Sequence, residues 1–173
     1  MTTSDSSTQP PTYLLDGKGG ARQIAHEMRS QEPPAGETLW LQLDYTHEDA
    51  QRWLIDTSGI DPIVIETLLA EDTRPRCFVH GNGLLVTLRG VNLNPGEDPD
   101  DMVSIRIWLE PTRIITVSHR RLMALEDLSC SLKNGDGPVD CGDFIVALSQ
   151  ALTRRMAGVL DNFDDGVSEL EDE

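Results

Sequence analysis

The chain is poor in cysteine and in long apolar runs. Its three cysteines are Cys77, Cys130 and Cys141, and no two of them form a CxxC pair. Neither a disulfide framework nor a cysteine zinc clip is therefore indicated, and this usage is typical of a reducing cytoplasm. The sequence has no run of about eighteen apolar residues, so it predicts no membrane-spanning helix within itself. Its first residues also lack the basic and apolar regions of a signal peptide.

Positive charge is scarce. Thirty acidic residues face fourteen lysines and arginines, which leaves a net charge of −16. Such a chain is repelled by nucleic acid and by anionic membrane surfaces, whereas cations or a basic protein suit it. The excess is concentrated in one internal segment, residues 97–101, and in the last thirteen residues, which contribute Asp161, Asp164, Asp165, Glu169, Glu171, Asp172 and Glu173.

Motifs of enzymes are also missing. The chain has no GxSxG, no Walker A loop and no GxGxxG after a strand, so we predict no catalytic residue and no organic cofactor. Apolar residues make up 38% of the 173 residues and charged residues 25%, a composition typical of one folded domain with a substantial core.

The patterning predicts three parts. Residues 1–11 are rich in Ser, Thr and Pro and are expected to be disordered, residues 12–139 form one α/β domain, and residues 140–173 begin a long helix. In the first half we expect a strand from Tyr13, a short helix over 21–30, a strand over 38–43, and helices over 47–57 and from Asp61 to about Ala70, the first capped by Thr46.

The middle of the chain has the pattern of β-structure. Strands are predicted over 77–79, 84–89, 102–109 and 113–118, with a hairpin turn at Gly81-Asn82-Gly83. In the third of these, Val103, Ile105, Ile107 and Leu109 share one face, whereas Ser104 and Arg106 point the other way. Short connections make the four strands an antiparallel meander, and the flanking helical patterns give an α+β class with helices covering one sheet.

Helical periodicity returns after residue 122. A short helix is predicted over 122–128, and from about Asp140 one apolar stripe runs to the end through Phe144, Leu148, Leu152, Met156, Val159, Phe163, Val167 and Leu170. No glycine or proline stop signal closes this stripe, so we expect the chain to be cut inside a longer helix.

Two patterns could hold a metal ion. The acidic loop, residues 95–101, carries Glu97, Asp98, Asp100 and Asp101, whose carboxylates suit hard cations such as Mg²⁺ or Ca²⁺, although a solvated loop has the same composition. The alternative, zinc held by Cys130 and Cys141, finds no support in the spacing of His26, His47, His80 and His119, which favours ordinary cysteines and histidines. The loop is therefore the candidate divalent-cation site.

Five segments together resemble a known family: Thr73-Arg-Pro-Arg-Cys, Leu88-Arg-Gly-Val-Asn-Leu-Asn-Pro-Gly, Asp101-Met-Val-Ser-Ile-Arg, Arg120-Arg-Leu-Met-Ala-Leu-Glu-Asp and Asn134-Gly-Asp-Gly-Pro-Val-Asp-Cys-Gly. They are similar to the N-terminal cytoplasmic domain of the ZntB zinc transporters, in the CorA metal-ion transporter superfamily. The resemblance implies a mixed, largely antiparallel sheet sandwiched by helices, which leads into a long C-terminal stalk helix. It also implies a homopentamer at the cytoplasmic face of the bacterial inner membrane, held in the membrane only by a region after residue 173.

By this resemblance the chain is expected to form an acidic vestibule or regulatory funnel for divalent-cation transport, with zinc as the transported ion and a regulatory cation at residues 97–101. A negative funnel concentrates divalent cations, which agrees with the charge of the chain. Two alternatives stay open. One is the cytoplasmic domain of a CorA-type magnesium or cobalt channel, and the other is a soluble acidic adaptor that binds a basic protein through its C-terminal helix.

Overall fold

The computed structural model describes residues 10–71 and 74–171, with side chains described as far as residue 161. The segment expected to be disordered, 1–11, therefore lies almost entirely outside the described residues. The strands are β1 Thr12–Leu15, β2 Ala21–Ile24, β3 Thr38–Asp44, β4 Arg76–His80, β5 Gly83–Gly90, β6 Val103–Glu110 and β7 Arg113–Ser118. The helices are a 3₁₀ turn η1 His26–Ser30, α1 Glu48–Asp56, α2 Pro62–Leu69, α3 Met123–Asn134 and α4 Cys141–Glu171.

The described strands form one mixed sheet in the order β2-β1-β3-β7-β6-β5-β4. Strands β4 to β7 are neighbours in chain order and antiparallel, which confirms the predicted meander. The parallel pair is β3 with β7, in a register that sets Leu41 beside Ile115 and Asp44 beside Ser118. This pair connects the three N-terminal strands to the meander.

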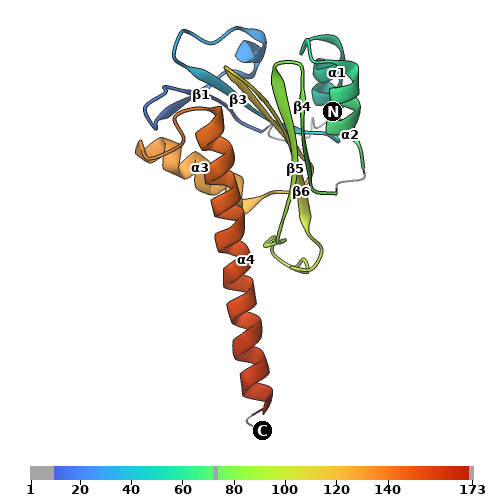
Figure 1. The fold of residues 1–173 in the computed structure, drawn as a ribbon, viewed down its shortest axis with the longest axis vertical. Helices are drawn as coiled ribbons and strands as arrows, with labels where there is room; N and C mark the ends of the chain where they lie inside the picture. Colours follow the sequence, from blue (N-terminus) through green and yellow to red (C-terminus); the bar gives the residue numbers. More distant parts are fainter. Residues whose placement is uncertain (1–9, 72–73, 172–173) are drawn as a thin grey trace, which may run out of the picture.

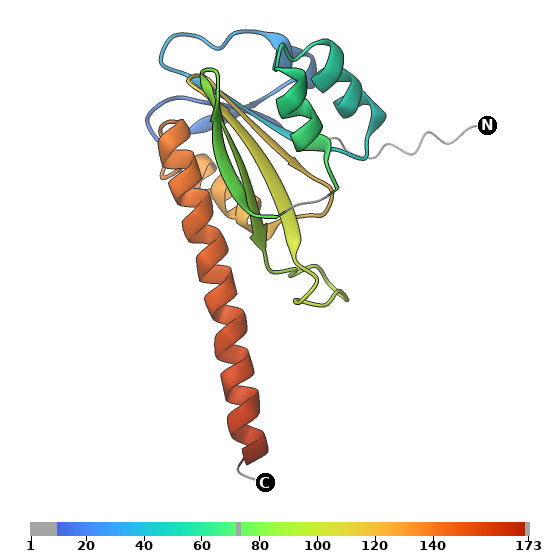
Figure 2. The ribbon, with the colours of Figure 1, turned by 45° about the vertical axis from the view of Figure 1, so that its right-hand side comes forward.

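Helices cover both faces of the sheet (Figures 1 and 2). Because successive strand residues point to opposite faces, β3 serves both layers. Leu39, Leu41 and Leu43 pack with buried residues of α1 and α2, as their alternation predicted, whereas Trp40 packs with those of α3 and α4. The α+β sandwich implied by the resemblance is confirmed.

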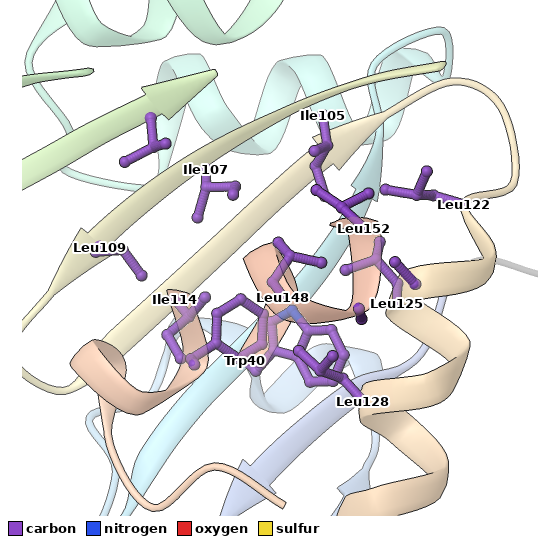
Figure 3. Packing of buried hydrophobic residues seen from close by; sticks show 14 of the residues in the cluster. Trp40, Ile105, Ile107, Leu109, Ile114, Leu122, Leu125, Leu128, Leu148 and Leu152 are labelled. Carbon is purple, nitrogen blue, oxygen red and sulfur yellow. The ribbon is translucent and has the colours of Figure 1, made fainter. Parts of the chain in front are cut away.

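Trp40 lies at the centre of the second layer, where Figure 3 shows it between Ile114, Leu128 and Leu148. Its indole is fully buried, stacks on Tyr13 with a centroid separation of 5.3 Å, and meets the ring of Phe144 edge-on at 5.0 Å. The indole nitrogen donates a 3.1 Å hydrogen bond to the Thr116 hydroxyl, so its polar atom is satisfied inside the core.

Two local predictions are wrong. Residues 21–30 are not one helix, because Ala21–Ile24 pairs antiparallel with β1 and only His26–Ser30 forms a 3₁₀ turn. The β1–β2 turn is closed by the Asp16 carboxylate, which accepts hydrogen bonds from the amides of Lys18 and Gly20. Thr46 does not cap α1, whose N-cap is His47, and its hydroxyl donates instead to the Asp44 carboxylate at 2.7 Å.

The predicted start of α2 is confirmed. The Asp61 side chain accepts a 3.0 Å hydrogen bond from the amide of Ile63, and Pro62 is the first helical residue. This arrangement satisfies one free amide of the first turn and places proline where its missing N–H costs nothing.

The long helix expected from about Asp140 is present as α4, and it projects well beyond the sheet (Figure 1). Phe144, Leu148 and Leu152 are buried against the sheet and α3. Further along, Met156 is 37% exposed and Leu160 63% exposed. The apolar stripe is therefore covered by the domain only in the first part of the helix, and the side chains expected to continue it from Phe163 lie outside those described.

A half-buried ion pair closes the turn between β6 and β7. The Arg113 guanidinium contacts both oxygens of the Glu110 carboxylate, at 2.6 and 2.9 Å, and also donates to the Ser58 carbonyl at 2.8 Å. The Trp108 indole nitrogen donates to the same carboxylate at 2.9 Å. Burial raises the pKa of the Glu110 carboxyl, but the hydrogen bonds from Arg113 and Trp108 outweigh burial, so the pKa lies below its usual value.

Glu110→Gln is expected to lower the free energy of unfolding by about 1–3 kcal/mol at neutral pH, because two charged hydrogen bonds and the indole bond are weakened. A carboxyl with a depressed folded pKa stabilises the fold above its unfolded pKa, and this contribution disappears as the pH falls through the folded pKa. Urea denaturation from pH 7 toward pH 3 should show the difference between the two proteins shrinking. The exposed Glu66→Gln serves as the control, and a difference that is constant with pH would contradict the assignment.

Candidate functional site

The acidic loop lies within the connection from β5 to β6, residues 91–102, at the end of the sheet from which α4 projects (Figures 1 and 2). Its fold depends on Asn92, which is buried. The Asn92 amide oxygen accepts bonds from the backbone and side-chain nitrogens of Asn94 at 3.1 and 2.8 Å, and its nitrogen donates to the Glu97 carboxylate. Gly96 has a φ of +80°, a conformation that glycine adopts without strain. The loop is therefore held by side chains of its own segment.

The four predicted carboxylates have different partners. Asp98 accepts a 3.0 Å hydrogen bond from the amide of Asp100 and so stabilises the turn. Asp101 contacts the Arg120 guanidinium at 2.5 Å, and Glu97 lies 3.7 Å from the same group. Asp100 is exposed. All four residues are close in sequence, but two of them, Glu97 and Asp101, already form ion pairs with Arg120.

The Arg120 guanidinium therefore lies beside the two carboxylates that would attract a metal cation. The hydrogen bond to Asp101 is the main cause that raises the pKa of this guanidinium. In the part of the chain that is described, no group of three or more His, Cys, Asp or Glu side chains has a geometry that could hold a metal ion. The assignment of Glu97, Asp98, Asp100 and Asp101 as a metal site stays a prediction.

The three cysteines differ in their exposure to solvent. Cys77 and Cys130 are exposed, whereas Cys141 is half-buried and its thiol donates to the Glu110 carbonyl at 2.9 Å. Burial, together with the charges of Asp140 and Glu110, raises the pKa of the Cys141 thiol to about 11. A metal prefers a thiolate, so this environment disfavours Cys141 as a ligand at neutral pH.

One group of titratable side chains was not predicted. The Asp44 carboxylate lies 3.4 Å from Nδ1 of His119 and 3.6 Å from Nε2 of His47. His47 follows Asp44 closely in sequence, but His119 reaches it only because β3 and β7 run parallel and end together. The sequence analysis did not bring His119 close to Asp44, because the local patterns indicated only antiparallel strand neighbours and not the parallel pair of β3 and β7.

Similarity to known proteins identifies the family of this chain. Residues 35–173, most of the chain, match the family described as CorA-like Mg²⁺ transporter protein. The chain belongs to the CorA-like Mg²⁺ transporter family. Within this CorA-like family it is similar to ZntB proteins: it is 37% identical over 161 residues to the zinc transport protein ZntB of Enterobacter sp. (strain 638), covering 92% of this chain and 48% of that protein. The ZntB protein of Yersinia enterocolitica is 34% identical over 162 residues.

Solved structures agree in fold. The full-length CmaX protein superposes with a TM-score of 0.90 at 35% identity, over 98% of this chain and 53% of that one. The ZntB cytoplasmic domain from Vibrio parahaemolyticus gives 0.82 at 22% identity, over 93% of this chain and 64% of that one, which supports the fold. The chain spans about half the length of the curated relatives it matches. None of the helices described here combines the length and apolar character needed to cross a bilayer.

The thiol environments in this CorA-like chain predict an order of reactivity. Cys77 and Cys130 are expected to react with iodoacetamide at pH 8, whereas Cys141 should react at least about tenfold more slowly, because little of a thiol with so high a pKa is ionised. Mass spectrometry of timed digests measures each site, and the unfolded chain in urea is the control in which the three rates converge. Equal rates in the folded chain would contradict the buried environment of Cys141.

Proposed function

We propose that this chain is the cytoplasmic domain of a bacterial inner-membrane divalent-cation transporter, and that zinc is the transported ion. The observation that carries the proposal is the 37% identity to a zinc transport protein over 92% of the chain. The magnesium alternative is favoured by the family description, whereas the likeness to the CorA magnesium transporter from Methanocaldococcus jannaschii, at 16% identity, concerns the fold alone. The names of the more similar relatives therefore favour zinc over magnesium as the transported ion.

The test is ion uptake into proteoliposomes that contain the full-length protein carrying this chain. Zinc influx above that of empty vesicles is expected, with a comparison in the presence and absence of a pH gradient to reveal coupling to protons. Magnesium or cobalt influx without zinc influx would favour the CorA-type channel. If correctly folded protein moves none of these ions, the proposed transport is wrong and the acidic-adaptor alternative gains support.

The proposed assembly is a homopentamer. Support comes from the projecting part of α4, where Met156 of the predicted stripe and the nearby Leu160 are apolar side chains that the domain itself leaves exposed. An apolar face of this kind on a projecting helix suits burial against copies of the same helix. Such an assembly would gather five acidic loops at the same end, and the resulting negative potential would concentrate divalent cations.

The proposed regulatory cation binds at the acidic loop in competition with Arg120. A divalent ion that contacts Glu97 and Asp101 has to displace the guanidinium that now contacts both. The Arg120 guanidinium therefore acts as an internal cation that relieves repulsion between these two carboxylates. Because of this competition, loss of a loop carboxylate and loss of Arg120 are expected to change the cation affinity in opposite directions.

In calorimetric titrations of the assembled full-length protein with Mg²⁺ and Zn²⁺, Asp101→Asn is expected to weaken binding by roughly tenfold, equivalent to about 1.4 kcal/mol. Arg120→Gln is expected to strengthen binding, because it releases two carboxylates. Glu66→Gln, on exposed α2 surface, removes one acid elsewhere and should change little. Binding that weakens in Arg120→Gln, or that is unchanged in Asp101→Asn, would contradict a cation site at this loop.

A further inference from the structure

A cavity of about 230 Å³ lies where the start of β6 meets the end of β3 and the residues that follow β7. Its wall includes Tyr45, Ser104, Arg106, His119 and Arg120. Arg106 was predicted to point away from the apolar face of β6, and it does, but helices cover that face as well. The side chain is 2% exposed, so it is the most deeply buried charged residue in the wall.

The contacts of Arg106 leave its charge poorly compensated. The guanidinium carbon lies 4.8 Å from the centre of the Tyr45 ring, and one terminal nitrogen donates to the Ala70 carbonyl at the end of α2. Its Nε–H has no hydrogen-bond partner among the described residues. Burial lowers the pKa of this guanidinium, which is the direction expected of a cation taken out of water with too little compensation.

Three other arginines differ from Arg106. Arg113, Arg120 and Arg155 each contact a carboxylate within 3 Å. The described residues supply no such carboxylate to Arg106, although the chain has a large excess of acids. Arg106 lines a cavity with room for a small molecule, and its buried guanidinium lacks both a carboxylate and one hydrogen-bond partner among the residues described, so a ligand in the cavity could supply the missing negative charge.

We propose that this cavity binds a small oxyanion from solution, such as phosphate or a small carboxylate. The guanidinium has the planar set of donors that pairs with oxyanions. Arg120 and His119 add positive or polar groups to the same wall. Asp101 and Glu71 also line the cavity, but Asp101 is contacted by Arg120 and Glu71 is exposed, which weakens their repulsion.

The site shares Arg120 and Asp101 with the acidic loop beside it, but it takes a ligand of the opposite charge. The inference concerns this chain alone and holds whether or not the transported ion is zinc.

The test is an NMR titration of the 173-residue chain with inorganic phosphate, and separately with acetate, each against chloride at equal ionic strength. The Nε–H signal of Arg106 and the amides of Tyr45 and His119 are expected to shift with one saturable affinity. Selectivity for phosphate or for acetate identifies the kind of oxyanion. Shifts no larger than those caused by chloride would overturn the proposal, because they would reflect general salt.

Two variants complete the test. Arg106→Lys keeps the charge and loses the planar donors, and it should weaken oxyanion binding by about tenfold or more, as expected for a lost charge-assisted pair. Arg22→Gln removes an exposed arginine from β2, far along the sheet order, and should leave the affinity unchanged. Equal affinity in Arg106→Lys and the unaltered chain would overturn the assignment, and the wild-type titration decides the matter if Arg106→Lys fails to fold.

Discussion

The parallel pairing of β3 with β7 is the contact on which the rest of the structure depends. It connects β1, β2 and β3 to the meander in the sheet, and the connection between the two strands contains α1, α2 and three further strands. Trp40 strengthens the pair through its bond to Thr116 and at the same time packs against Phe144 of α4. One strand pair therefore positions both helical layers and the origin of the projecting helix.

Electrostatics impose the second constraint. With a net charge of −16, the chain cannot gather its acids at one end without compensation. The acidic loop and the C-terminal part of α4 both extend from the same end of the sheet (Figure 2). Within the loop, Arg120 supplies a positive group to Asp101 and Glu97. Arg120 offsets only part of the loop's negative charge, and bringing several copies together would increase the demand for cations, which supports the proposed function.

Local patterns predicted local structure well. The hairpin at Gly81-Asn82-Gly83, the alternation of β6 and the first part of the α4 stripe, from Phe144 to Leu152, all depend on neighbours close in sequence, and each was predicted correctly. Residues 21–24 were assigned to a helix because their true partner, β1, lies across a tight glycine turn whose geometry the pattern does not show. Arg120 and His119 were missed as site residues for a related reason, since each acts on a residue distant in sequence.

The burial of Arg106 shows the same limit in physical terms. Alternation in a strand distinguishes two faces, but it does not tell whether the second face meets water or another layer of helices. Both faces of the central strands are covered, so ligands can reach the polar groups of those strands only at the strand ends. The C-terminal ends of β3 and β7 and the start of β6 meet at one such end, because β6 is antiparallel to β7. Asp44, His119, Arg120, Asp101 and Arg106 are gathered there by the topology, although no two of their strands are consecutive except β6 and β7.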